Sequence, residues 1–149
     1  MIGKIKDLRY LKKKRKGERG KLIKELDKWF SLYIRLRDAN SNGMVRCFTS
    51  GKLMYYKKAQ AGHYISRRYF PTRWDEKNVQ IQSVGENIFN QGNAPVFGQK
   101  LNEKYGPGTT DMLLIKKGNR FKVAEFEMRH MISDYKKRVK ELLKNINLE

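Results

Sequence analysis

The chain has 149 residues, of which 34 are Lys or Arg and 15 are Asp or Glu, so its formal charge is +19. This length suits one domain, and a 39% hydrophobic share supplies a modest core, which excludes full disorder. A single cysteine, Cys47, excludes an intramolecular disulfide framework. No apolar run approaches the ~20 residues of a membrane-spanning helix, so we expect a cytoplasmic protein without a membrane partner.

So large an excess of positive charge favours a polyanionic partner, because binding releases the counterions condensed on that partner. Nucleic acid is the leading candidate, but RNA, duplex DNA and an anionic membrane surface share this signature. A surface charged only for solubility is the plain alternative. Charge therefore indicates the class of partner and leaves its identity open.

Residues 1–20 contain nine basic side chains against two acidic ones. We predict a flexible basic arm here, since like charges repel one another and few apolar groups oppose them. The densest cluster in this arm, a candidate nucleic-acid contact, consists of Lys12, Lys13, Lys14, Arg15 and Lys16.

From residue 21, apolar side chains recur at steps of three and four residues, which is typical of one helix face. This face comprises Leu22, Leu26, Trp29, Phe30, Tyr33 and Leu36. We expect its aromatic rings in the core rather than stacked on bases. Asp38, Asn40 and Gly43 then end the helix.

Two short runs rich in β-forming residues, 44–48 and 53–56, predict a hairpin. Another extended stretch is expected at 63–66. Pro71 and the polar residues after it predict a loop, because proline cannot join a central ladder.

Ser83, with Glu86 three residues later, can form a capping box and so predicts a short helix. Further helices are expected up to Tyr105, from Thr110 to a stop at Gly118, and over 123–145. The expected apolar side of the last helix comprises Phe126, Met131, Ile132, Tyr135, Val139 and Leu142 or Leu143.

Three side chains have the order and spacing of an HNH, or ββα-metal, nuclease motif. His63 is expected on a strand, Asn78 fifteen residues later in a loop, and Asn87 nine residues further on a helix. An asparagine stands where the motif has its third histidine. The structural alternatives are an interior histidine, a turn asparagine and a surface asparagine.

Phosphodiester hydrolysis needs a base that activates water, a divalent cation that neutralises charge at the phosphate, and a group that orients the base. A neutral imidazole can act as the base near neutral pH, and an amide oxygen is an adequate ligand of Mg²⁺ or Mn²⁺. We therefore predict that His63 is the base and that Asn78 orients it. Asn87 is the predicted metal ligand, with Asn90 or an acidic residue.

Three arginines, Arg67, Arg68 and Arg73, lie close to this motif in sequence. A guanidinium can hold a phosphate with two parallel hydrogen bonds, so we predict that they contact the nucleic-acid backbone. The alternative is that they are ordinary solvated charges.

The stretch 26–105 resembles the phage recombination nuclease family known as NinG or Rap. The matching segments are LDKWFSLYIRLRD at 26–38, CFTSG at 47–51, QAGHYISRR at 60–68, TRWDEKN at 72–78 and FNQGN at 89–93. The resemblance implies a structure-specific endonuclease that uses a divalent cation to cut branched DNA such as Holliday junctions and displacement loops. If a phage encodes the chain, its location is the host-cell cytoplasm.

The family pattern has two Cys-x-x-Cys pairs that form a structural zinc site, and they map to Cys47 and Ser50, then to Ser83 and Glu86. One thiol cannot supply a thiolate quartet, so we predict no structural zinc.

Related HNH enzymes often have an acidic metal ligand before the catalytic histidine, where this chain has Gly62. Four residues could complete the set of metal ligands, namely Asp75, Glu76, Glu86 and Asn90.

The sequence thus predicts an α+β fold, with a small HNH-like ββα-metal core and long flanking amphipathic helices. Its expected parts are the arm at 1–20, a helix and nuclease core at 21–106, and a basic, DNA-gripping helical segment at 107–149. Since a four-way junction has two equivalent strands to cut, we expect a homodimer. The alternatives are a branched-DNA-binding protein with weakened catalysis and, from charge alone, an RNA-binding protein.

Overall fold

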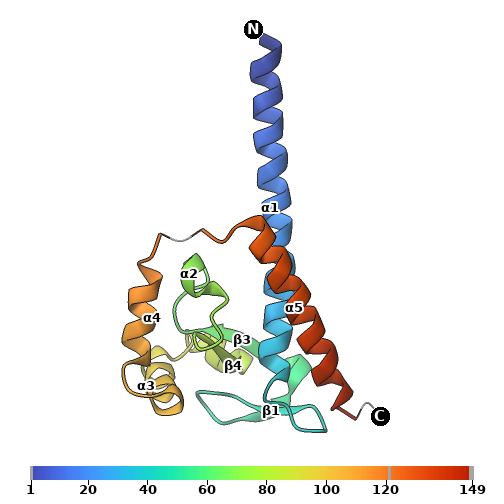
Figure 1. Cartoon of the computed structure of the whole chain (residues 1–149). Helices are drawn as coiled ribbons and strands as arrows, with labels where there is room; N and C mark the ends of the chain where they lie inside the picture. The colour runs from blue at the N-terminus through green and yellow to red at the C-terminus, as the bar shows by residue number, and fades with distance from the viewer. Residues whose placement is uncertain (1, 121, 148–149) are drawn as a thin grey trace.

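The structure of the protein is a computed structural model, which describes residues 2–120 and 122–147, with side chains from residue 8 onward (Figure 1). It combines helices with two small antiparallel sheets of two strands each. This arrangement confirms the α+β class. None of the helices described has the length and apolarity needed to cross a membrane.

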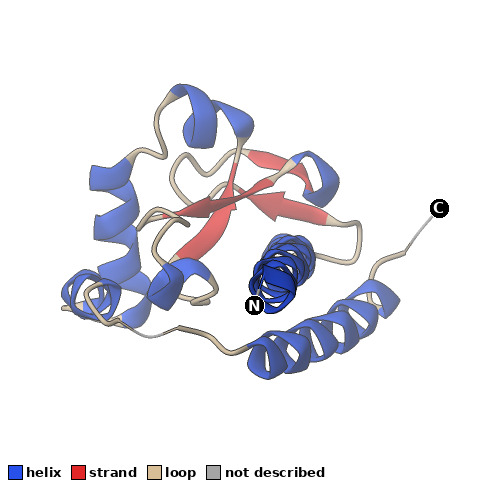
Figure 2. Ribbon diagram, turned by 90° about the horizontal axis from the view of Figure 1, so that it is seen from above, coloured by secondary structure: helices blue, strands red, loops and turns tan. Residues whose placement is uncertain are grey.

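Helix α1 (Ile2–Leu36) is the central element, and its second half runs through the core. The buried side chains Leu22, Leu26, Phe30 and Ile34 follow one another at four-residue steps along one face. Seen along α1, the strands lie on one side of the helix and α5 passes on another (Figure 2).

The first half of α1 projects away from the rest of the molecule (Figure 1). The predicted arm is therefore not separated from the helix after residue 20 but is continuous with it. Lys, Arg and Leu are good helix formers, and α1 contains no proline, so local propensity extends the helix through this basic stretch. The side chains of residues 8–18 are all exposed.

Helix α5 (Glu125–Lys144) packs along the second half of α1. Its buried side chains are Met128, Ile132, Tyr135 and Val139. Phe126, predicted on the apolar side, is instead 74% exposed. It lies two residues before Met128, and two steps of about 100° place it on the opposite face of the helix.

The predicted hairpin is confirmed, with β1 (Met44–Arg46) antiparallel to β2 (Leu53–Tyr55). The second sheet pairs β3 (Gln60–His63) with β4 (Val79–Gln82). The extended stretch expected at 63–66 is thus three residues too late.

The sequence analysis did not identify β4 because alternate residues of this strand are glutamines. Gln80 and Gln82 are nonetheless fully buried. The Gln80 amide accepts from Arg37 at 2.6 Å, and the Gln82 amide donates to Thr49 Oγ1 at 3.1 Å. Such bonds offset the loss of water for the Gln80 amide and for Gln82 Nε2, whereas Gln82 Oε1 is buried without a hydrogen-bond partner in the described part of the chain.

The remaining helical elements are η1 (Tyr56–Lys58), α2 (Phe70–Arg73), η2 (Gly85–Phe89), α3 (Ala94–Tyr105) and α4 (Thr109–Lys117). The last two were predicted. Helix α2 forms where a loop was expected, because Pro71 sits in its first turn, which proline favours. The helix predicted after Ser83 is a single π-helical turn, η2.

Glu76, in the loop before β4, connects this loop to both long helices. Its carboxylate accepts from the Tyr33 hydroxyl of α1 at 3.2 Å and from the Tyr135 hydroxyl of α5 at 3.1 Å. It also pairs with Arg138 at 2.6 Å. Because one carboxylate serves three donors, the pairing of α1 with α5 depends on Glu76 as well as on apolar contacts.

We predict that Glu76→Gln lowers the free energy of unfolding by about 1–2 kcal/mol, because Arg138 loses its charged partner while the site remains partly exposed. Urea denaturation measures this loss. The matched control is Glu141→Gln, whose pairing with Lys144 is well exposed and should change stability little. Equal stabilities of the two variants would contradict the prediction.

Candidate active site

The candidate site lies where β3 and β4 meet the loop and turn that follow them. The antiparallel register pairs His63 with Val79 and Gln60 with Gln82. The turn after β4 therefore lies beside the start of β3, while His63 lies at the other end of that strand. A cavity of about 610 Å³ is lined by residues from both ends, His63 and Asn87 among them.

The His63 ring is fixed by one hydrogen bond, between Nε2 and the backbone carbonyl of Arg73 at 2.9 Å. A carbonyl oxygen can only accept, so Nε2 has the proton in the neutral ring, and Nδ1 retains its lone pair. Nδ1 has no hydrogen-bond partner within the described part of the chain.

The surroundings of His63 favour the neutral ring. Burial lowers its pKa, whereas the Arg73 carbonyl and the charge of Asp27 oppose that shift. Arg73 and Arg67 lower the pKa further through their positive charges. A neutral imidazole with one unpaired nitrogen can accept a proton near neutral pH.

Asn78 is fully buried and fastens the chain just beyond His63. Its Oδ1 accepts from the Ile65 amide at 2.8 Å, and its Nδ2 donates to the carbonyls of Ile65 and Thr72 at 3.0 Å each. Its own carbonyl accepts from the Tyr64 amide at 2.9 Å. Asn78 therefore acts on the backbone that follows His63 and makes no hydrogen bond to the imidazole.

Asn87 lines the same cavity as His63. Its Nδ2 donates to Gln60 Oε1 at 2.7 Å, which leaves Oδ1 as the end of the amide available to a cation. Asn90, the second predicted ligand, does not line the cavity; it is exposed and donates to Glu86 at 3.2 Å. The structure thus places His63 and Asn87 on the lining of one cavity and leaves Asn90 outside it.

The three acidic residues proposed as further metal ligands also lie away from this cavity. Asp75 pairs with Lys116, and Glu76 is held by Arg138. Glu86 accepts from Asn90 and from Asn93.

Among the described residues that line the cavity, Asp27 alone is a carboxylate. Both of its oxygens are already bonded: Arg73 donates to them at 2.9 and 2.5 Å, and Trp74 Nε1 donates to Oδ1 at 2.9 Å. Sequence reasoning missed Asp27 because its partners lie 46 and 47 residues away. No local signal distinguishes it from other polar positions of a helix.

The three predicted phosphate contacts differ in their surroundings. Arg67 is exposed and lines the cavity, and Arg68 is exposed with its guanidinium 5.0 Å from the centre of the Tyr69 ring. Arg73 is instead bound to Asp27, so its guanidinium has a structural partner inside the protein. The predicted basic cluster at 12–16 lies on the projecting, exposed part of α1.

The positions that the resemblance assigns to zinc meet around one sulfur. Cys47 Sγ accepts from the Ser83 amide at 3.3 Å and lies 3.6 Å from Thr49 Oγ1. Burial raises the pKa of the thiol, but hydrogen bonds from Ser50, Ser83 and Thr49 outweigh it and lower that pKa to about 7. Ser83 Oγ accepts from the Glu86 amide at 3.3 Å. Hydrogen bonds therefore connect the two segments.

Throughout residues 8–120 and 122–147, no three His, Cys, Asp or Glu side chains form a group that could hold a metal ion. The residues at the cavity suit a metal ion that takes few ligands from the protein. Mg²⁺ keeps several waters and often takes substrate phosphate oxygens, so it needs few protein ligands. The amide oxygen of Asn87 is suited to that requirement.

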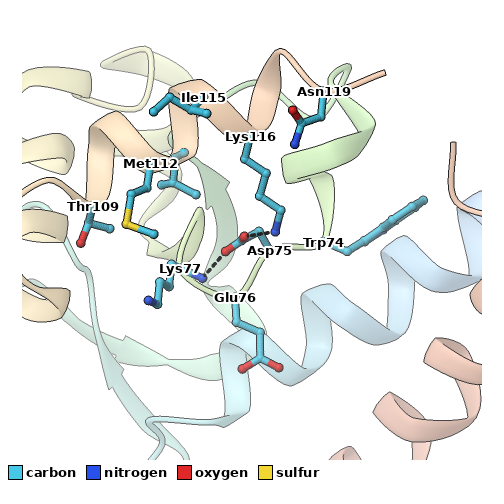
Figure 3. Close-up of a pocket in the computed structure, with 10 residues that line it drawn as sticks. Trp74, Asp75, Glu76, Lys77, Thr109, Met112, Ile115, Lys116 and Asn119 are labelled. Atoms are coloured by element: carbon cyan, nitrogen blue, oxygen red, sulfur yellow. Dashed lines mark hydrogen bonds and ion pairs between the residues drawn. The ribbon is translucent and has the colours of Figure 1, made fainter. Parts of the chain in front are cut away.

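A larger cavity, of about 740 Å³, lies between α4 and residues 74–77 (Figure 3). Met112 and Ile115 line it, and the ion pair of Asp75 and Lys116 crosses it. It contains neither His63 nor Asn87. Both carboxylates that line it, Asp75 and Glu76, are paired with basic side chains, so the smaller cavity is the candidate site.

The sequence model of the family described as Bacteriophage Lambda NinG protein matches residues 4–145. The chain belongs to this family. NinG membership associates it with bacteriophage recombination, and the match extends well beyond the stretch 26–105. No curated protein and no solved structure matches the chain significantly.

In this NinG-family chain, Asn78→Ala should lower the free energy of unfolding by about 2–3 kcal/mol, because the buried amide of Ile65 loses its partner. Urea denaturation measures the loss. Asn90→Ala removes an exposed amide and should stay within about 0.5 kcal/mol of the wild type. Similar losses in the two variants would contradict a fastening role for Asn78.

The absence of structural zinc remains a prediction. We expect that EDTA leaves the Tm of this NinG-family chain unchanged, because one thiol and its hydrogen bonds replace a metal there. Thermal unfolding with and without the chelator tests this. A Tm that falls with EDTA and recovers on addition of Zn²⁺ would show that a metal supports the fold.

Proposed function

We propose that the chain is a divalent-metal-dependent endonuclease that hydrolyses branched DNA recombination intermediates, such as Holliday junctions and displacement loops. The main support is the His63 ring, whose Nε2 is held by a carbonyl while Nδ1 remains unpaired beside the cavity that Asn87 also lines. Membership of the NinG family supports a substrate in recombination. The site of action would be the host-cell cytoplasm.

In this proposal, Nδ1 of His63 takes a proton from the attacking water as the water oxygen bonds to phosphorus and the P–O bond to the leaving oxygen breaks. The Arg73 carbonyl keeps the ring in the required tautomer. Asn78 keeps the backbone beyond His63 in place. The pKa of His63, lowered by burial, keeps the ring available as a base below pH 6.5.

Asn87 Oδ1 is the protein ligand we propose for Mg²⁺ or Mn²⁺, with the remaining ligands from phosphate and water. Such an ion, when bound, would neutralise charge that develops at the phosphate. The side-chain oxygen Oε1 of Gln60 accepts from Asn87 Nδ2 and so keeps the Asn87 amide turned with its oxygen available.

The charge distribution supports a grip on DNA phosphates. Arg67 lies at the cavity and Arg68 close by, whereas the cluster at 12–16 projects on α1, a helix about 50 Å long. One chain could therefore contact a DNA arm well away from the cut. Shape, rather than base sequence, would decide such binding. A homodimer would supply one site for each of two equivalent strands.

The second candidate is a branched-DNA-binding protein with weakened catalysis. It is favoured by one observation, namely that both oxygens of Asp27, the carboxylate at the cavity, are bonded within the protein.

Cleavage of a labelled four-way junction in Mg²⁺ or Mn²⁺ tests the proposal. His63→Ala should lower the single-turnover rate about 10²–10⁴-fold without weakening junction binding, because the base is lost. The matched control is His130→Ala, an exposed histidine of α5, which should cleave as the wild type does. The wild-type rate should fall with pH only below 6.5, as His63 gains its proton.

Equal rates for the wild type and His63→Ala would show that His63 is not the base. Tight junction binding by the wild type without cleavage in either cation would favour the second candidate.

A further inference from the structure

The turn η2 exposes an aromatic ring beside the candidate site. Phe89 is 82% exposed, the largest value among the large apolar side chains described, and its neighbour Ile88 is 56% exposed. Water makes such exposure unfavourable, and a folded chain ordinarily buries a phenylalanine. Phe89 and Ile88 together present an apolar surface to the solvent.

The turn that presents Phe89 is firmly braced. The Glu86 carboxylate accepts from Asn90 at 3.2 Å and from Asn93 at 3.0 Å, and its backbone carbonyl accepts from the Gly92 amide at 2.7 Å. The buried Gln82 amide donates to the Gly92 carbonyl at 2.8 Å. Phe89 is thus exposed by a turn that is fixed on both sides.

This bracing holds an unfavourable backbone. Three successive residues, Gln91, Gly92 and Asn93, have φ of 50°, 79° and 50°. The left-handed region costs a residue other than glycine on the order of 1 kcal/mol. Such conformations persist where the surroundings impose them, and they are concentrated at functional sites.

Phe89 belongs to the segment that lines one side of the cavity containing His63. Asn87 and Ile88 before it, and Gln91 and Gly92 after it, all line that cavity. Arg67 lines it too and adds a positive charge to the cavity. A positive charge at the cavity of a chain with charge +19 favours a polyanion such as DNA.

We propose that Phe89, flanked by Ile88, stacks on an unstacked base at the branch point of the DNA. This inference rests on the proposed function and adds the residue that selects branched over continuous duplex. In a continuous duplex every base face is covered by its neighbours, while a branch point leaves base faces exposed. Insertion of apolar side chains at such steps is a known way to bind distorted DNA.

Binding in EDTA tests the inference apart from cleavage. Fluorescence anisotropy gives the Kd for a four-way junction and for a duplex of the same length. Phe89→Ala should weaken junction binding about tenfold or more and leave duplex binding unchanged, whereas Phe89→Trp should retain selectivity. A 2-aminopurine at the branch point should change fluorescence on binding the wild type and not on binding Phe89→Ala.

Phe126→Ala is the matched control, because Phe126 is 74% exposed but lies on α5. The inference is overturned if both alanine variants have the junction-to-duplex ratio of the wild type. It is also overturned if Phe89→Ala weakens junction and duplex equally, or if it changes the oligomeric state in sedimentation and so identifies a contact between chains. If the wild type does not cleave the junction but its preference for junction over duplex is lost in Phe89→Ala, only the proposed function is contradicted.

Discussion

The ion pair of Asp27 and Arg73 is the contact on which the geometry of the site depends. Asp27 lies on α1, and both of its carboxylate oxygens accept from the Arg73 guanidinium. Its Oδ1 also accepts from the Trp74 indole. The backbone carbonyl of the same Arg73 accepts from Nε2 of His63. Helix α1 thus fixes Arg73 through Asp27, and the Arg73 carbonyl leaves Nδ1 as the unpaired nitrogen of His63. Both partners are partly buried, so loss of either would leave a poorly solvated charge without its counterion.

The distribution of acidic residues explains how so basic a chain can fold and still present basic groups at the candidate site. Asp27, Asp75 and Glu76 all pair with basic groups inside the molecule, where they connect α1, α4 and α5 to the loop before β4. These pairs offset repulsion within the fold. The one carboxylate among the described residues that line the cavity, Asp27, is already paired with Arg73, so it does not neutralise Arg67. The surface near His63 therefore favours an anion. Electrostatics of the fold and of the site therefore follow from one arrangement.

Helices and hairpin could be predicted from the sequence because their signals are local. Apolar side chains at three- and four-residue steps identify the second half of α1 and most of α5, and β-forming runs around a turn identify β1 and β2. The strand β4 was missed because its alternate positions are glutamines, whose burial depends on distant hydrogen-bond partners. The arm at 1–20 was separated from α1 on charge, although helix propensity continues through it.

The sequence by itself determined the net charge, the helical periods and the spacing from His63 through Asn78 to Asn87, and the structure brings His63 and Asn87 to one cavity. Only the tertiary structure decided that Asn90 and the predicted acidic ligands lie elsewhere, that Asp27 lines the cavity and that Arg73 is bound within the protein. The reason is physical: a period or a motif depends on neighbours along the chain, whereas the partner of Asp27 lies 46 residues away and is chosen by the packing of α1 against the loop.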